Sequence, residues 1–233
     1  MRRLNYLKMN NVAVILAAGD GTRMKSKKSK LLLEINGMTV IERTVRAFAC
    51  VPLIDEIIVV CREADLESFE AVLNNYDISY CFGGKTRQES VSNAVEVIDD
   101  CNLIIIHDGA RPLVSRQEIE ETIDVALKKD AAAVGVAVKD TIKIIGKGLK
   151  IVSTPDRGTL VAIRTPQIFN FELYRQALET ANNNNLDFTD DCALVENIGK
   201  DVYVVPGSFD NIKITTPEDI AVAESILRTK GEA

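Results

Sequence analysis

The chain has 233 residues, a mass of 25.6 kDa, 46% hydrophobic residues and 27% charged residues. This balance excludes a largely disordered chain, and a chain of this length buries about 70% of its unfolded surface without disulfide or metal support. A net charge of −6, with 5% aromatic residues and no tryptophan, argues against a protein whose main partner is nucleic acid.

The cysteine and histidine contents narrow the chemistry further. Five widely spaced cysteines without a CxxC pair predict buried thiols in the reducing cytoplasm. The single histidine, His107, argues against a histidine-rich metal site and a Ser/His/Asp triad. No apolar run reaches the roughly 18 residues of a membrane span, and no signal-type apolar core follows the basic N-terminus. We therefore expect a cytoplasmic protein without a membrane partner.

Short apolar runs alternate with amphipathic segments along the chain. The runs predict strands at 12–17, 56–61, 78–81, 103–107, 132–138 and 202–205. The amphipathic segments predict helices at about 40–49, 65–75, 88–98, 116–129, 170–181 and 217–229. Because the strands lack polar alternation, we expect both faces of the sheet to be covered. The order predicts an α/β fold, a Rossmann-like, doubly wound, mostly parallel sheet, in one domain over residues 1–233.

The segment 141–163 breaks this rhythm. Residues 142–145 and 149–152 read as two short strands joined through Gly146 and Gly148, a β-hairpin signal. The hairpin is either a surface excursion or an arm, at about 139–160, that hides its edges against a second subunit. We favour the arm, and with it a homodimer.

The strongest chemical signal follows the first predicted strand. Gly19 and Gly21 stand where backbone N–H groups can approach a phosphate. Five basic residues and one acidic residue lie between Asp20 and Lys30, including Arg23. Neither the dinucleotide fingerprint nor a P-loop is present. This segment predicts a site for a polyanion such as a triphosphate.

Two further motifs end predicted strands. Gly83 and Gly84, with Ser90 in the first turn of the next helix, suit hydrogen bonds to a flat base or an anion. Asp108 stands at the carboxyl end of the strand 103–107, where a carboxylate facing phosphates can hold Mg²⁺. Arg111 could clamp a phosphate, whereas His107 is expected to be a packed, hydrogen-bonded side chain.

Four later segments carry polar residues in settings that read as loops. They are TPDR at 154–157, TPQ at 165–167, FTDDCA at 188–193 and DNIKITT at 210–216. Pattern alone leaves most of their side chains as solvated loop residues.

Taken in order, the motifs resemble one enzyme family from about Val12 to Leu227. LAAGxGxRM…K is shared by sugar and alcohol nucleotidyltransferases, and GGxxRxxSV, HDGARP, DRxxLxxxxTPQ, TDD and DNIKIT narrow the resemblance. The chain resembles the 2-C-methyl-D-erythritol 4-phosphate cytidylyltransferases of the non-mevalonate isoprenoid pathway. The resemblance implies that CTP and the polyol phosphate give a CDP-alcohol and pyrophosphate with Mg²⁺, in a homodimer joined by a β-arm.

The resemblance also implies roles for individual residues. Those for catalysis are Arg23, Lys30, Arg157 and Lys213. Those for CTP are Ala17, Ala18, Gly19, Gly21, Arg23, Lys30, Gly84, Ser90 and Asp108, with Asp108 also at the metal. Those for the polyol phosphate are Asp108, Arg111, Thr141, Arg157, Thr189 and Lys213, with Arg157 serving the neighbouring subunit's site.

Two positions depart from the family pattern, and three alternatives remain. Ser29 replaces a frequent proline, so the loop loses a rigid residue, and Lys85 replaces a frequent acidic residue. A ribitol 5-phosphate cytidylyltransferase shares the fold and most motifs. A catalytically silent nucleotide-binding module is disfavoured because Arg23, Lys30 and Asp108 are present, and a dehydrogenase is disfavoured by the missing third glycine.

Overall fold

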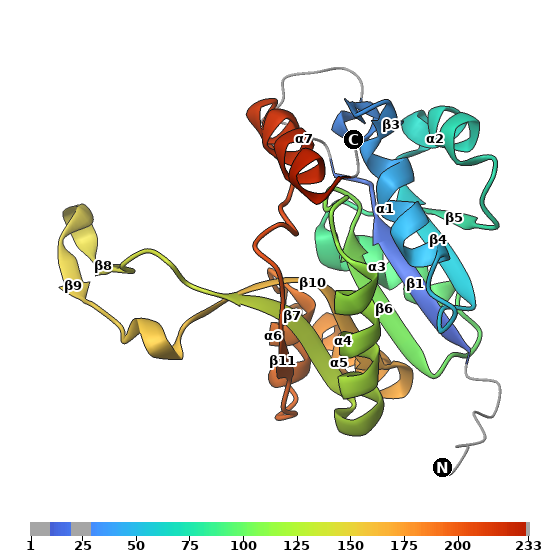
Figure 1. Ribbon diagram of the computed structural model, residues 1–233. Helices are drawn as coiled ribbons and strands as arrows, with labels where there is room; N and C mark the ends of the chain where they lie inside the picture. Colours follow the sequence, from blue (N-terminus) through green and yellow to red (C-terminus); the bar gives the residue numbers. More distant parts are fainter. Residues whose placement is uncertain (1–9, 20–28, 232–233) are drawn as a thin grey trace, which may run out of the picture.

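A seven-stranded sheet forms the centre of the computed structural model, which describes residues 10–19 and 29–231 (Figure 1). The strand order is β11-β7-β10-β6-β1-β4-β5. The strands of the sheet are β1 (Asn11–Leu16), β4 (Glu56–Cys61), β5 (Ser79–Phe82), β6 (Leu103–Asp108), β7 (Ala131–Ala137), β10 (Val161–Asn170) and β11 (Tyr203–Pro206). All neighbouring pairs are parallel except those of β10, which runs antiparallel to β6 and β7. The predicted doubly wound, mostly parallel sheet is confirmed.

The central strands are apolar on both faces because helices cover both faces. Val14 of β1 pairs with Ile58 of β4 and with Ile106 of β6, and all three are buried. Such runs bury every side chain, so their pattern is continuous rather than alternating.

Four helices cover one face and three cover the other (Figure 1). The first group is α1 (Val40–Ala49), α2 (Leu66–Leu73), α4 (Arg116–Lys129) and α7 (Glu218–Lys230). The second group is α3 (Arg87–Glu96), α5 (Phe171–Asn183) and α6 (Asp191–Glu196). Ser115 and Glu118 form the predicted capping box of α4. A small hairpin of β2 (Glu34–Ile35) and β3 (Met38–Thr39) precedes α1.

Two of the segments that read as loops belong to regular elements. Thr165 and Gln167 lie inside β10, where each side chain is only 3% exposed. The prediction failed there because Pro166 and a register shift between Ile163 and Gln167 interrupt the strand pattern. Asp191 begins α6, which is too short to show helical periodicity, and Asp190 caps it by accepting a hydrogen bond from the Ala193 amide.

The predicted hairpin projects away from the sheet (Figure 1). It consists of β8 (Ile144–Ile145) and β9 (Ile151–Ser153), which pair antiparallel, and its strands are shorter than the sequence suggests. Residues 139–160, the predicted arm, leave the sheet after β7 and return to it at β10. Leu149 is 80% exposed and Val152 is 66% exposed. The arm therefore carries apolar side chains that no described part of the same chain covers.

All five cysteines are free thiols. Cys61, Cys81, Cys101 and Cys192 are buried as predicted, but Cys50 is exposed because it follows the last residue of α1 at the surface. Across residues 10–19 and 29–231, no helix has the length and apolar character needed to cross a membrane.

Candidate active site

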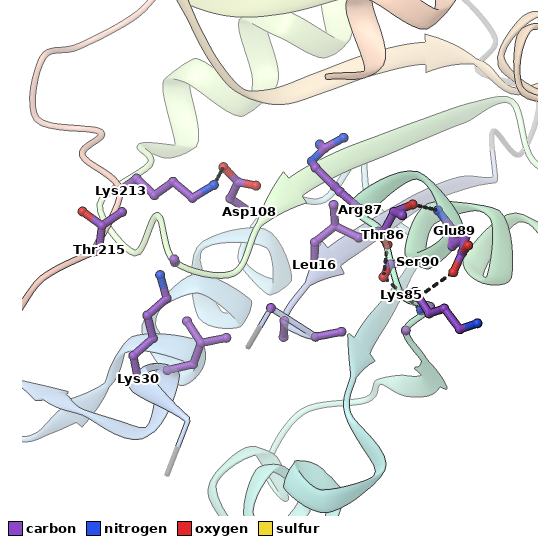
Figure 2. A pocket seen from close by; sticks show the side chains of 17 residues that line it. Leu16, Lys30, Lys85, Thr86, Arg87, Glu89, Ser90, Asp108, Lys213 and Thr215 are labelled. Atoms are coloured by element: carbon purple, nitrogen blue, oxygen red, sulfur yellow. Dashed lines mark hydrogen bonds and ion pairs between the residues drawn. The ribbon is translucent and has the colours of Figure 1, made fainter. Parts of the chain in front are cut away.

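A pocket of about 880 Å³ opens at the carboxyl ends of β1, β5 and β6. Ligands of open α/β sheets bind at this edge, where strands end and loops can approach a ligand. The lining residues are Leu16, Ala17, Ala18, Gly19, Lys30, Leu31, Gly83, Gly84, Lys85, Thr86, Arg87, Glu89, Ser90, Asp108, Ala110, Lys213 and Thr215. In Figure 2, the labelled residues of α3 and of the turn before it lie across the pocket from Lys30, Asp108 and Lys213.

Eight of the residues named from the sequence meet in this pocket. They are Ala17, Ala18, Gly19, Lys30, Gly84, Ser90, Asp108 and Lys213. Gly21 and Arg23 lie outside the described residues, so their predicted roles remain predictions. The main sequence motifs thus converge on one cavity, although up to 196 positions separate their members along the chain.

One end of the pocket is a tight backbone turn at the start of α3. The Gly84 amide donates a hydrogen bond to Ser90 Oγ (3.1 Å), and Ser90 Oγ donates to the Thr86 carbonyl (2.9 Å). A Cβ atom at Gly83 would stand 2.3 Å from the Ala18 Cβ. Only glycine allows this close approach of the two strand ends. The result is a narrow slot with backbone edges, which suits a flat base.

The opposite end of the pocket is charged. Lys213 Nζ lies 3.0 Å from Asp108 Oδ2, and Arg111 Nε lies 3.2 Å from the same oxygen. Lys30 Nζ donates to the Ile214 carbonyl (2.8 Å), which places its ammonium group beside this cluster. Burial alone would raise the pKa of Asp108, but the positive charges of Lys213, Arg87 and Arg111 hold that pKa well below its usual range. Asp108 is therefore a permanent carboxylate.

His107 has the structural role expected from the sequence. It is fully buried, its Nδ1 lies 3.0 Å from Thr165 Oγ1, and its Nε2 lies 3.1 Å from the Arg111 carbonyl. Burial lowers the pKa of His107 to about 3, so the ring is neutral near pH 7. His107 supports the strand end that carries Asp108 and does not face the pocket.

Arg87 is a pocket residue to which the sequence assigned no role. Its Nη2 lies 2.6 Å from Asp191 Oδ2, and Asp191 Oδ1 accepts a hydrogen bond from the Tyr174 hydroxyl (2.7 Å). Asp191 and Tyr174 are buried on the α6 and α5 side of the sheet. Arg87 and Asp191 lie in the GGxxRxxSV and TDD motifs, which were the only signal for them in the sequence. The pairing itself was not predictable, because 104 positions separate the two residues.

Four residues expected at the polyol phosphate do not line this pocket. Arg111 pairs with Asp108, and Thr189 is exposed two residues before α6. Thr141 and Arg157 are exposed on the arm, and Arg157 Nη1 donates to the Lys139 carbonyl (2.9 Å). Within the described parts of one chain, the arm residues are thus separate from the pocket.

Known proteins match the chain over nearly its whole length. The family model described as 2-C-methyl-D-erythritol 4-phosphate cytidylyltransferase matches residues 11–229. Proteins with that name from Clostridioides difficile and Caldanaerobacter subterraneus are 43% and 46% identical, over 92% and 94% of this chain and 92% and 100% of their own. The crystal structure of a 4-diphosphocytidyl-2C-methyl-D-erythritol synthase from Anaerococcus prevotii has a TM-score of 0.86 and 36% identity, and the match covers 94% of this chain and 96% of that one. The chain belongs to the 2-C-methyl-D-erythritol 4-phosphate cytidylyltransferase family.

Proposed function

We propose that this enzyme transfers the cytidylyl group of CTP to 2-C-methyl-D-erythritol 4-phosphate and releases pyrophosphate, as a step of isoprenoid biosynthesis. The observation that carries the proposal is the two-ended pocket, in which a glycine slot for a base faces a charged cluster of Lys30, Asp108 and Lys213. The family to which the chain belongs supports the same reaction.

The geometry suggests how the reaction is helped. The cytosine would lie against Gly84 and Ser90, which leaves the triphosphate to extend toward Lys30. A phosphate oxygen of the polyol phosphate attacks the α-phosphorus in line, and the bond to the bridging oxygen of the pyrophosphate breaks. Lys30, with the predicted help of Arg23, stabilises the charge that develops on the pyrophosphate, and Lys213 orients the attacking phosphate. Positioning and charge stabilisation therefore account for most of the catalysis.

We infer that Asp108 holds Mg²⁺ together with phosphate oxygens of CTP. Mg²⁺ is commonly bound by one or two carboxylates and substrate phosphates rather than by a complete protein cage. The donor set fits, because Lys213 and Arg111 both contact Oδ2 of Asp108, and Oδ1 accepts no hydrogen bond from the described residues. No group of three or more possible ligand side chains occurs in the described part of the chain. Bound there, the ion would neutralise phosphate charge.

We also propose a homodimer in which each arm reaches the other subunit. The exposed apolar side chains of the arm, Leu149 and Val152 among them, support this proposal. Thr141 and Arg157 would then complete a pocket from which they are separate in their own chain. Five free thiols are consistent with the reducing cytoplasm as the place of action.

Pyrophosphate release tests the proposal directly. The enzyme is supplied with CTP and Mg²⁺, with either 2-C-methyl-D-erythritol 4-phosphate or ribitol 5-phosphate. We expect release with the first polyol phosphate and little with the second, because the relatives from Clostridioides difficile and Caldanaerobacter subterraneus carry the first substrate in their names. Release with ribitol 5-phosphate alone would leave the fold and CTP site unchanged but refute the assigned substrate. No pyrophosphate release with either polyol phosphate would favour a catalytically silent nucleotide-binding module.

A further inference from the structure

Two side chains at the base of the arm contact the loop that presents Lys213 to Asp108. We call residues 208–215 the Lys213 loop. The chain leaves β7 at Ala137 and rejoins the sheet at Val161, where β10 begins. Lys139 lies just beyond the first point and Arg164 just beyond the second. Both ends of the arm therefore border the same catalytic loop.

Arg164 makes the more extensive contact. Its Nη1 lies within hydrogen-bond distance of three carbonyl oxygens of the Lys213 loop: Ser208 (3.1 Å), Phe209 (3.3 Å) and Asn211 (2.6 Å). The Arg164 side chain is partly buried, and its charge strengthens hydrogen bonds to neutral acceptors. One guanidinium group thus holds the first half of the loop against β10.

Lys139 makes a weaker contact on the opposite side of the arm's base. Its Nζ lies 3.6 Å from the centre of the Phe209 ring, a cation–π geometry. The carbonyl of Lys139 accepts a hydrogen bond from Arg157, the arm residue expected to serve the neighbouring subunit. A continuous set of contacts therefore runs from Arg157 through Lys139 to the Lys213 loop.

The Lys213 loop is also held on the side of the pocket. Arg111 Nη1 donates to the Asn211 carbonyl (2.9 Å), the acceptor it shares with Arg164, and the fully buried Asn211 side chain donates to the Thr165 carbonyl (3.0 Å). Two residues later, Lys213 reaches Asp108. The position of the Asn211 carbonyl thus links the base of the arm to the charged cluster of the pocket.

We propose that Arg164 is a positioning residue: it holds the Lys213 loop so that the Lys213 ammonium group meets Asp108 and the attacking phosphate. This role rests on the proposed cytidylyl transfer for its kinetic consequence. Among the described residues, the Arg164 guanidinium bonds only to Ser208, Phe209 and Asn211, none of which lines the pocket, so its loss should affect the chemical step more than the binding of CTP. Through the same contacts, a shift of the base of the arm would also move the Lys213 ammonium group.

The test compares Arg164→Ala and Arg164→Lys with Arg175→Ala as a matched control. Arg175 is an exposed residue of α5 that pairs only with Glu172 among the described contacts, so its substitution removes the same charge without removing a described contact to the loop. Because small misplacements of reacting groups reduce rates strongly, we expect Arg164→Ala to lower kcat by about ten- to a hundred-fold, with KM for CTP within about two-fold of wild type. Arg164→Lys should recover part of the loss, since an ammonium group also donates to carbonyls.

A second readout needs no substrate. Amide hydrogen exchange of residues 208–215 should be faster in Arg164→Ala than in wild type and in Arg175→Ala, while the amides of β1 and β6 keep their protection. Thermal melting establishes that each variant is folded, and Arg164→Lys replaces Arg164→Ala if the latter does not fold. If the wild type releases no pyrophosphate, the proposed function fails, but the exchange experiment still decides whether Arg164 holds the loop.

Three results would overturn the positioning role. The first is a wild-type kcat in folded Arg164→Ala. The second is unchanged exchange in residues 208–215. The third is a loss of activity that follows only from dissociation, seen as a monomer mass by light scattering where Arg175→Ala remains a dimer.

Discussion

The pocket and the arm differ in how the chain supports them. The pocket lies on strand ends whose side chains are buried on both faces of the sheet, and Asp108 is fixed there by Lys213 and Arg111. The arm has only a short two-stranded pairing, of β8 with β9, and every residue from Asp140 to Thr154 is exposed. An isolated two-stranded hairpin is marginally stable in water, so the arm needs a partner surface that the pocket does not need.

In the proposed homodimer, each chain would carry two unequal halves of a site. The body of the fold supplies the nucleotide slot and the charged cluster. The arm would supply Thr141 and Arg157, neither of which lines the pocket in the described part of its own chain. Substitutions in the body should therefore act on the subunit's own site, whereas substitutions in the arm should act on the neighbouring subunit's site or on assembly.

The largest effect is expected at Lys30 in the pocket. Lys30→Ala removes the ammonium group that is expected to stabilise the pyrophosphate leaving group, a contact worth about 10²- to 10³-fold in turnover. Pyrophosphate release should fall by that factor, while the circular dichroism spectrum is unchanged. Lys200→Ala, an exposed lysine outside the pocket, is the control and should keep full turnover. Near wild-type turnover in Lys30→Ala would contradict the assignment of this loop.

Removing the arm should abolish dimer formation while the body of each subunit remains folded. When residues 141–152 are replaced by a short Gly-Ser link, we expect light scattering to give a monomer, because the exposed apolar side chains of the arm are lost. Pyrophosphate release should fall as well, because the monomer lacks the arm residues of a second subunit. An unchanged mass would reject the arm as the dimer contact.

The cysteines provide the control for that deletion. In the native body, only Cys50 is exposed, and burial raises the pKa of Cys61 and Cys81 to about 11. Reaction with a thiol reagent should therefore modify one cysteine quickly in both the wild type and the deletion variant. Rapid modification of the buried cysteines in the deletion variant would show that the arm is needed for the body to fold.

The smallest expected effects are changes in the free energy of unfolding when one hydrogen bond is removed from the body or from the arm. Thr165 Oγ1 accepts from the Asp108 amide (3.1 Å) and contacts His107 Nδ1 (3.0 Å), and all three residues are buried. Thr165→Val should lower the free energy of unfolding by about 2 kcal/mol, because buried polar groups lose their partner. Lys143→Ala removes an exposed bond to Thr154 Oγ1 and should change it by less than about 0.5 kcal/mol. Urea denaturation measures the free energy of unfolding of both variants. Equal decreases would contradict the conclusion that the body is more strongly supported by its own chain than the arm is.

The sequence predicted the parallel core because its signal is local. Continuous apolar runs gave six of the seven strands of the sheet within about one residue at most of their ends, and a serine and a glutamate three positions apart marked the start of α4. β10 was missed because a strand that contains Pro166 and shifts register has no regular period. α6 was missed because its six residues are too few to show one.

The site was predictable where a motif places its residues at a strand end. Gly84, Ser90 and Asp108 needed only their own strands to be located correctly. The contacts that join distant segments were not predictable, because no local pattern records a partner. Arg87 with Asp191, and Arg164 with the carbonyls of the Lys213 loop, became visible only when the sheet brought β10, α3 and α6 together.

Mixing two variants that we expect to be inactive tests the proposed two-halves arrangement most directly. Lys30→Ala should be defective in the body and Arg157→Ala in the arm, and the two are dissociated and reassociated in equal amounts. If arms serve the neighbouring subunit, a mixed dimer contains one fully wild-type site, so random association should restore about a quarter of wild-type pyrophosphate release. If each arm serves its own subunit, or if the enzyme acts as a monomer, the mixture will release only the residual amounts of the two variants, and the account will be wrong.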